Sequence, residues 1–341
     1  MWPATKGHTM TPGISTEILD LRHFGAPMLR PVLDAECELW SQRLHWDYRN
    51  SCRPLLQYLD NHMLPGYAAV ESGVVTGYTF CVYEETKAII GDVFACASPV
   101  SDENRTASAS PHATEEMLLR HLFETLLNSP QVERIESQLL LHPSGTHADV
   151  FRGAGFDLYR RLFMVQQLIG RWGNPHAHLA PELELRPWHD DDLSPAAHLI
   201  SRAYHGHADS LINDQYNSVY GSMRFLNNIV HYAGCGSFSP MASHVVVERS
   251  SEEVVALVLC SRVSQQSGHI TQICVDPAWR RRGIARQLLS IAAAQFLRQG
   301  VSEVSLTVTE ANTEAVELYR SEGYDCAHTF DAAVWLRNDA R

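Results

Sequence analysis

The sequence has no apolar run that approaches the ~18 residues of a transmembrane helix, and residues 1–16 lack the apolar core of a secretion signal. The eight cysteines are scattered singly, without a Cys-x-x-Cys pair, so we expect reduced and mostly buried thiols. These absences predict a cytoplasmic protein with no membrane partner.

Positive charge is in deficit, because 27 Lys and Arg residues stand against 39 Asp and Glu residues and the formal net charge is −12. This excess of negative charge opposes binding to a polyanion, so we expect no nucleic-acid partner. The composition is otherwise ordinary for a soluble globular protein, with 45% hydrophobic and 19% charged residues. A length of 341 residues predicts two domains of about 150 residues each.

Four arginines lie close together in one loop, residues 280–286. The apolar segment 270–275 predicts a strand that leads into this loop, and an amphipathic helix is expected directly after it. Unpaired N–H groups and the positive end of the helix dipole make such a helix start suitable for a diphosphate. Gly283 lets an anion approach the backbone, and Ala285 keeps the next inward position small. A solvated basic loop or a short nucleic-acid patch is the alternative, which the net negative charge disfavours.

A second pattern follows the loop, because residues 303–309 alternate as a strand does and a spaced set of residues comes after them. That set is Asn312, Ala315, Leu318, Tyr319, Gly323 and Tyr324. Together with Arg280-x-x-Gly283-x-Ala285 after Val275-Asp276-Pro277, this order resembles the cofactor-binding half of the GNAT superfamily of N-acetyltransferases. The resemblance is specific over residues 268–337 and weaker over 184–267.

The resemblance implies an α/β fold of the mixed α+β GNAT type, in which helices flank a twisted and mostly antiparallel sheet. It also implies acetyl-CoA as co-substrate, without a metal. The implied cofactor-binding residues come from the strand before the loop, the loop itself and the last helix. They are Ile273, Cys274, Val275, Arg280, Arg281, Arg282, Gly283, Ile284, Ala285, Arg286, Asn312 and Tyr319.

Tyr319 stands where the family carries its usual general acid, which gives a proton to the departing CoA thiolate. Tyr319 could instead be a core side chain, and Asn312 could act only as the N-cap of a helix over 313–321. Cys274 is not expected to form an acyl-enzyme, because no fixed histidine or helix start lies near it to activate the thiol.

The sequence leaves the identity of the general base undecided. His269 replaces a glutamate that some family members carry, and Thr307 cannot serve at the position that others use. A water chain or a residue of the helical segment 203–210 are the alternatives. That segment lies in the region of the family's substrate wall, and its candidate substrate-binding residues are His205, His207 and Asp209. This cluster has no second ligand pair, so we expect no metal there.

An internal repeat relates the two halves of the chain, because residues 150–157 match residues 318–325 at an offset of 168. Residues 171–182 contain Gly and two prolines and break both periodicities, which predicts a linker. We therefore expect a first GNAT-like domain over 1–170 and an acetyl-CoA-binding GNAT domain over 183–341.

The first copy is expected to be degenerate. Phe151 and Ser144 stand at the positions of Tyr319 and Asn312, and residues 99–106 carry two acidic residues where a diphosphate loop is needed. A structural or substrate-shaping role is expected for this domain, with a rearranged cofactor site as the alternative.

The function that the resemblance implies is transfer of an acetyl group from acetyl-CoA to a primary amine by direct attack. Five aspartates early in the second domain weakly favour a cationic acceptor, whose identity and the oligomeric state stay open. The alternative function is a non-catalytic acyl-CoA-binding or protein-interaction module.

Overall fold

The computed structural model describes residues 16–97, 110–168, 179–232, 234 and 236–337. The acidic segment 99–106 and most of the expected linker therefore lie outside the described residues. Over the described ranges, no helix combines the length and the apolarity that a membrane crossing requires.

The first half of the chain, residues 1–170, alternates helices with strands that pair mostly antiparallel. In chain order its elements are β1 (Glu17–Asp20), η1 (Leu21–His23), α1 (Ala26–Leu44), α2 (Arg49–Asp60), β2 (Gly66–Glu71), β3 (Val74–Glu84), β4 (Lys87–Ala95), α3 (Pro111–Asn128), β5 (Arg134–Gln138), α4 (Ala148–Gly153) and β6 (Asp157–Gln167). Strands β3 and β4 form a hairpin, because they pair antiparallel and Glu84 lies opposite Lys87 at the turn.

The second half repeats this order with additional short elements. Its elements are β7 (Leu183–Pro187), η2 (Asp190–Asp192), α5 (Leu193–Ala203), α6 (Asp209–Ile212), η3 (Asp214–Asn217), α7 (Val219–His231), β8 (Ser237–Phe238), β9 (His244–Glu248), β10 (Val254–Arg262), β11 (Ser267–Val275), η5 (Pro277–Trp279), α8 (Ile284–Arg298), β12 (Glu303–Thr309), α9 (Thr313–Ser321) and β13 (Asp325–Leu336). The strand predicted over 303–309 and the helix predicted over 313–321 are confirmed.

The segment 203–210 is not one helix, which corrects the sequence-based expectation. Helix α5 ends at Ala203 and α6 begins at Asp209. Between them, Gly206 has a φ of 70°, a left-handed conformation that does not continue a helix and that glycine adopts without strain.

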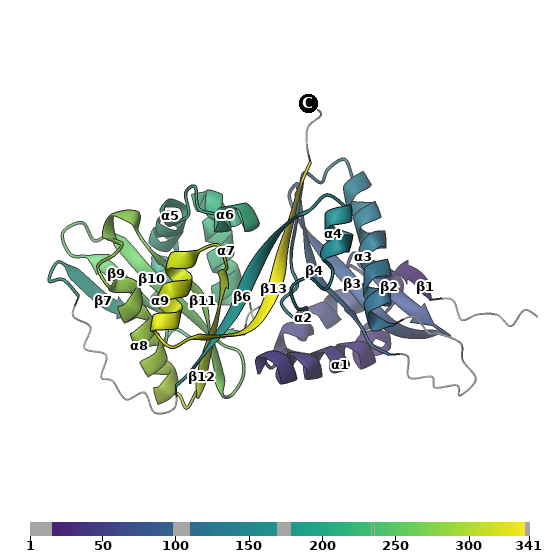
Figure 1. Cartoon of the computed structure of the whole chain (residues 1–341), viewed down its shortest axis with the longest axis horizontal. Helices are drawn as coiled ribbons and strands as arrows, with labels where there is room; N and C mark the ends of the chain where they lie inside the picture. The colour runs from purple at the N-terminus through teal and green to yellow at the C-terminus, as the bar shows by residue number, and fades with distance from the viewer. Residues whose placement is uncertain (1–15, 98–109, 169–178, 233, 235, 338–341) are drawn as a thin grey trace, which may run out of the picture.

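All strands belong to one sheet, in the order β1-β2-β3-β4-β5-β13-β6-β12-β11-β10-β9-β7, with β8 paired to β10 beside this path. Strand β13, from the end of the chain, lies beside β5 of the first half, and β6 lies beside β12 of the second half (Figure 1). The last strand of each half therefore pairs with a strand of the other half, β6 with β12 and β13 with β5. The mixed α/β fold with a mostly antiparallel sheet is confirmed, and the two expected sheets are joined through this exchange. The domain limits at residues 170 and 183 remain a prediction.

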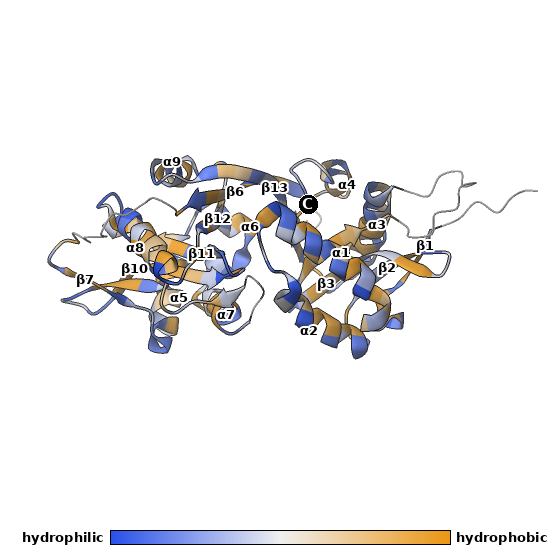
Figure 2. Cartoon of the chain, turned by 90° about the horizontal axis from the view of Figure 1, so that it is seen from below, coloured by the Kyte–Doolittle hydropathy of each residue, from blue (hydrophilic) through white to orange (hydrophobic). Residues whose placement is uncertain are grey.

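The hydrophobic cores follow the strand exchange. Leu162 and Met164 of β6 lie in the core of the second half, and Ala333 of β13 lies in the core of the first half. Apolar residues concentrate along the strands and on the helix sides turned toward them (Figure 2). In the second half, α8 covers one face of β10, and α5 and α7 cover the other. Helix α8 approaches β11 closely at Gly268, where a Cβ atom would lie 2.6 Å from the Phe296 ring.

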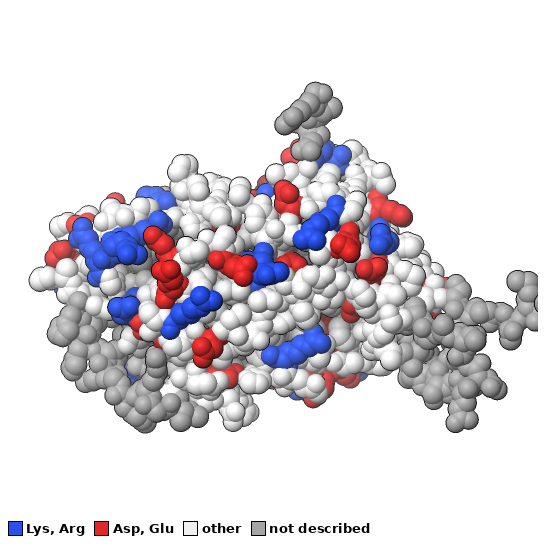
Figure 3. Space-filling view, viewed as in Figure 1, with Lys and Arg blue, Asp and Glu red and all other residues white. Residues whose placement is uncertain are grey.

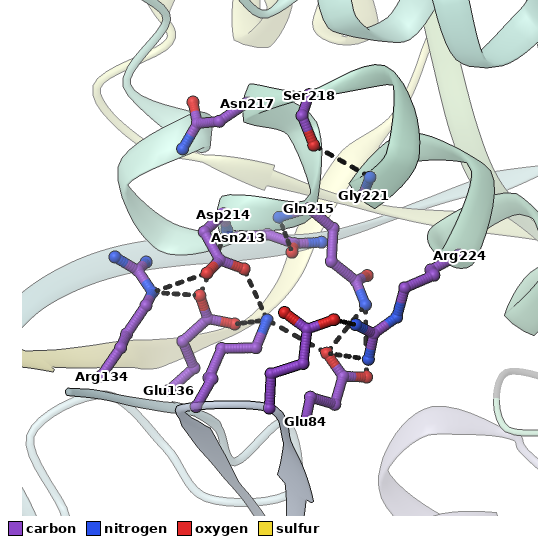
Figure 4. A network of polar contacts seen from close by, with 12 residues as sticks. Glu84, Arg134, Glu136, Asn213, Asp214, Gln215, Asn217, Ser218, Gly221 and Arg224 are labelled. Atoms are coloured by element: carbon purple, nitrogen blue, oxygen red, sulfur yellow. Dashed lines mark hydrogen bonds and ion pairs between the residues drawn. The ribbon is translucent and has the colours of Figure 1, made fainter. Parts of the chain in front are cut away.

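A network of ion pairs connects β3, β4 and β5 of the first half to η3 and α7 of the second half (Figure 4). Its centre is the buried Lys87 ammonium, which lies 2.5 Å from Asp214 and 3.3 Å from both Glu84 and Glu136. Burial alone would lower the pKa of Lys87, but the carboxylates of Glu136, Asp214 and Glu84 outweigh it and raise the pKa. Lys87 therefore carries its charge and neutralises carboxylates from both halves. The guanidinium groups in the network are those of Arg134 and Arg224.

Lys87→Met is expected to lower the free energy of unfolding by about 3 kcal/mol, because carboxylates from both halves then lose their shared cation. Urea denaturation followed by circular dichroism measures the change. Arg30→Met is the matched control, since Arg30 is exposed on α1. Equal unfolding midpoints for the two variants would show that the network does not stabilise the contact between the halves.

Candidate active site

The site is built where two neighbouring strands of the second half part. Strands β11 and β12 pair in parallel only from Ser267 to Ile270 on β11, opposite Glu303 to Leu306 on β12. Beyond this point β11 runs on to Val275, and β12 does not pair with it. A register shift in the β10–β11 ladder at Leu259 lies opposite this point, and such a bulge bends and twists a strand. Ile273, Cys274 and Val275 therefore lie on the part of β11 whose backbone is open toward β12.

The loop after β11 leads into helix α8, whose first turn has no side-chain cap. Arg281 and Gly283 both have left-handed backbone conformations, with φ of 64° and 78°. Gly283 is the N-cap of α8 and no side chain caps that helix. The first helical hydrogen bond runs from Gln287 N to Gly283 O at 3.2 Å, so the amides before Gln287 lie in the first turn without a helical acceptor. Unpaired N–H groups and the helix dipole favour a small anion at a helix start of this kind.

Two arginines of the loop form hydrogen bonds with neighbouring elements of the chain. Arg280 donates to the backbone oxygens of Val275 at 3.2 Å and Ala203 at 2.7 Å. Arg286 donates to Glu322 at 2.6 Å. These side chains therefore fix the loop between β11, α5 and α9, and Figure 3 shows basic side chains gathered at this end of the second half (upper left).

The other loop residues divide between surface and core. Arg282 lies over the Trp279 ring with 4.6 Å between the guanidinium carbon and the ring centroid, and it is exposed, as is Arg281. Ile284 is buried in the core, so only its backbone can contribute to an anion site. Ala285 is half-buried.

Tyr319 lies on α9 in a buried position. Its ring is 7% exposed and packs against Tyr324 with 5.9 Å between centroids. Burial raises the pKa of the Tyr319 phenol well above its ordinary value, the Asp209 carboxylate raises it further, and the Arg161 guanidinium lowers it. Tyr319 is therefore a neutral hydroxyl at working pH and holds a proton that it can donate.

A polar chain connects α6, β12 and α9 beside Tyr319. The Thr309 hydroxyl donates to Asp209 Oδ1, and Asp209 Oδ2 lies 3.6 Å from His207 Nδ1. The other ring nitrogen of His207, Nε2, lies 3.4 Å from Asn312 Nδ2. Asn312 also caps α9, because its Oδ1 accepts from Ala315 N at 3.3 Å, so both roles expected for this residue are compatible. The structure thus places His207 and Asp209 together with Asn312, whereas His205 is exposed.

His269 is a poor candidate for the general base, which corrects the sequence-based expectation. The residue is 4% exposed, its Nδ1 lies 2.9 Å from Ser305 Oγ, and its ring packs edge-on against Trp46 at 4.9 Å. Burial lowers the pKa of His269 to about 3. A nitrogen of such low basicity, enclosed by β12 and the loop after α1, does not take up the proton of an ammonium group near neutral pH. Burial likewise raises the pKa of the Cys274 thiol, which agrees with its exclusion as a nucleophile.

Two residues near Tyr319, Tyr204 and Arg161, were not found from the sequence. Tyr204 donates to Gln272 Oε1 at 3.1 Å and stacks on Tyr216 at 4.4 Å. Arg161 comes from the exchanged strand β6 and donates to Thr307 Oγ1 at 3.3 Å, while its buried Nε has no hydrogen-bond partner among the described residues. No sequence pattern marks Arg161, because it belongs to the other half of the chain.

The aspartates that favoured a cationic acceptor are mostly engaged elsewhere. Asp192 pairs with Arg186 at 2.6 Å, and Asp214 pairs with Lys87. Asp190 and Asp191 are exposed in η2. Asp209 alone of the five lies beside Tyr319, so the reason for expecting a cationic acceptor becomes weaker.

The first half keeps the geometry of the site without its chemistry. Strands β4 and β5 pair only from Lys87 to Ile90 and then part, as β11 and β12 do. The helix that follows, α3, is capped, because Ser110 Oγ accepts from Ala113 N at 3.2 Å. Phe151 stands at the position of Tyr319, is 5% exposed, and packs on Phe123. An anion site of the α8 type is therefore missing from the described part of the first half.

Comparison with known proteins agrees with this geometry. The family model described as the acetyltransferase (GNAT) family matches residues 211–324. The [ribosomal protein bS18]-alanine N-acetyltransferase of Haemophilus ducreyi is 30% identical over 74 residues, which are 22% of this chain and 50% of that protein. The match thus spans only about half the length of this curated relative.

Two solved structures are similar over nearly the whole chain. A GCN5-related N-acetyltransferase from Sphaerobacter thermophilus has a TM-score of 0.62 at 16% identity, over 96% of this chain and 97% of that one. A tandem GNAT protein from the clavulanic acid biosynthesis pathway has a TM-score of 0.57 at 13% identity, over 96% and 100%. Residues 211–324 therefore match the GNAT acetyltransferase family, and the chain as a whole has the fold of solved tandem GNAT proteins.

Proposed function

We propose that the second half of the chain transfers an acetyl group from acetyl-CoA to a primary amine, and that it does so in the cytoplasm. The observation that carries the proposal is the uncapped start of α8 at Gly283, next to the opening between β11 and β12. Bound there, acetyl-CoA would supply a thioester whose carbonyl carbon the amine attacks directly.

The loop and β11 are proposed to bind the cofactor. The first-turn amides of α8 hold the diphosphate, and Arg281 and Arg282 add positive charge at the surface. The open backbone of Ile273 to Val275 holds the pantetheine arm and aims an amide N–H at the acetyl oxygen. Asn312 orders the start of α9 beside the reacting group.

Tyr319 is proposed as the general acid, whose phenol gives its proton to the thiolate as the thioester bond breaks. Burial raises the pKa of this phenol, and it also raises the basicity of a thiolate that forms in the same surroundings, so the transfer remains feasible. Arg161 and Tyr204 are proposed to position the acetyl group and the acceptor, and the first half thereby contributes to the proposed site through β6.

His207 is proposed to accept the proton of the amine, either directly or through water, in place of His269. The Asp209 backbone N–H donates to His207 Nδ1 at 3.1 Å and holds the imidazole from one side, and Asn312 Nδ2 lies 3.4 Å from Nε2 on the other side. The exposed fraction of the His207 side chain is 29%, so a proton taken up there can pass to solvent.

His207→Gln is expected to lower turnover at pH 7 by about 100-fold, because the ammonium form of the acceptor then loses its base. The loss should shrink toward about pH 10, where much of a primary amine is already neutral. His205→Gln is the matched control, since His205 lies two residues earlier and is exposed. Turnover is measured by release of CoA thiol over this pH range. A loss of equal size at every pH would assign His207 a structural role instead.

The alternative function, a non-catalytic acyl-CoA-binding module, predicts binding without turnover. Calorimetric titration with acetyl-CoA gives the number of sites, and thiol release across a panel of primary amines gives activity. One site per chain with turnover of an amine supports the transferase. One site with no turnover across small amines, amino acids and peptide amino termini supports the binding module.

A further inference from the structure

A cluster of metal-ligand side chains lies in the first half, outside the proposed active site. His112 and Glu115 are on the first turns of α3, and His147 immediately precedes α4. Their ligand atoms all lie within 4.8 Å of one another. His112 and Glu115 are three residues apart on a helix and therefore point to the same side.

His147 is the residue that singles this cluster out. Its side chain is 3% exposed, and neither ring nitrogen has a hydrogen-bond partner among the described residues. A buried polar group without a partner is costly, so such groups are rare in native proteins. The Nε2 atom of His147 lies 3.3 Å from Glu115 Oε2. Two ligands of a tetrahedral zinc ion with bonds of about 2.0–2.1 Å are separated by about 3.3 Å, so this pair has the spacing that zinc requires.

The surroundings orient the ligand atoms. Glu115 Oε1 accepts from Ala95 N at 3.2 Å, which directs Oε2 toward the histidines. His142 Nε2 lies 2.8 Å from Val93 O and donates to it, so Nδ1 keeps its lone pair and lies 3.8 Å from Glu115 Oε2. Backbone carbonyls that hold the second nitrogen of a histidine in this way are common in metal sites.

We propose that His112, Glu115 and His147 bind one Zn²⁺ ion, with His142 beside them as a fourth ligand or as an orienting group. Imidazole nitrogen and carboxylate oxygen form a donor set that zinc accepts. His112 is exposed and its Nε2 lies 3.6 Å from Glu116, so it can turn to the ion without disturbing the core.

The position of the cluster indicates a structural role for a bound ion. It lies at the start of α3, the helix that corresponds to α8, and a pocket beside it is lined by His142, His147 and Phe151. A zinc ion would tie α3, α4 and the loop after β5 together where the first half has no described diphosphate site. The ligands lie 3 and 32 residues apart, a spacing that no short zinc motif has, which is why the sequence did not predict a metal.

The test compares zinc binding by the intact chain and its variants. The protein is stripped with a chelator, incubated with Zn²⁺, dialysed, and its metal content and affinity are measured by atomic emission and calorimetric titration. The chain has 18 histidines, so the informative quantity is the difference between variants. His112→Ala and His147→Asn should each lower the content by one equivalent and weaken that site at least tenfold. His121→Ala is the matched control, because His121 is also exposed on α3 but lies outside the cluster.

Thermal unfolding gives a second measurement that does not depend on activity. Zn²⁺ should raise the unfolding temperature of the wild type and of His121→Ala, but not of His112→Ala, whose exposed position leaves folding intact. Equal zinc content and equal thermal shifts in the wild type and His112→Ala would overturn the proposal. The contact between Glu115 and His147 would then be an ordinary buried ion pair.

Discussion

Gly283→Glu is expected to weaken acetyl-CoA binding at least 100-fold, which corresponds to about 2.7 kcal/mol. The added carboxylate would stand at the uncapped start of α8, where the proposed diphosphate binds, and would repel it. It would also satisfy the free first-turn amides itself, as an acidic side chain at a helix start does. Calorimetric titration of the intact chain with acetyl-CoA measures the change.

A matched pair of alanine variants separates the effect on binding from backbone strain. Gly283 and Gly300 lie at the two ends of α8 with φ of 78° and 76°, and an added Cβ at either would meet no atom within 4 Å. Gly283→Ala and Gly300→Ala should therefore cost similar stability, about 1 kcal/mol each. Gly283→Ala alone should lower acetyl-CoA affinity, by about tenfold. Equal affinities for the two variants, or tight binding by Gly283→Glu, would place the cofactor elsewhere.

Tyr319→Phe is expected to lower turnover by about 10²–10³-fold while acetyl-CoA affinity stays within about twofold of the wild type. The substitution keeps the ring that packs in the core and removes only the proposed proton donor. Thiol release under saturating acetyl-CoA measures turnover, and calorimetry measures affinity on the same samples.

Tyr324→Phe is the control for the loss of a buried tyrosine hydroxyl at the same place. Tyr324 is 1% exposed and its ring contacts that of Tyr319. Its variant should keep wild-type turnover, because the proposal gives it no part in the reaction. If Tyr319→Phe were as active as Tyr324→Phe, Tyr319 would be a core residue, which was the alternative left open by the sequence.

The local parts of the site could be predicted from the sequence because they are contiguous. A strand, a glycine-containing arginine loop and a helix start lie within residues 270–289, and their geometry follows from backbone rules alone. The strand over 303–309 and the helix over 313–321 were equally accessible, since each carries its own periodicity and the helix its own cap.

Side-chain roles that depend on burial could not be predicted from the sequence. His269 looked suitable as a base because histidine ordinarily titrates near neutrality, yet Trp46 and Phe163 of the first half enclose it and its pKa falls to about 3. The loop 203–210 looked helical, but Gly206 interrupts it and thereby turns His207 toward Asn312. The first difference arises from contacts made far along the chain, and the second from the local backbone conformation of Gly206.

The sequence by itself therefore determined the helix start after the arginine loop and the match of residues 150–157 to 318–325, in which Phe151 stands in place of Tyr319, because each of these is a short local pattern. The tertiary structure alone decided that the halves exchange β6 and β13, which brings Arg161 to Thr307 and gathers carboxylates from both halves around Lys87. It also placed His147 beside His112 and Glu115. The physical reason is that hydrogen bonding between strands and the burial of charge depend on which segments meet in space, and local sequence does not carry that information.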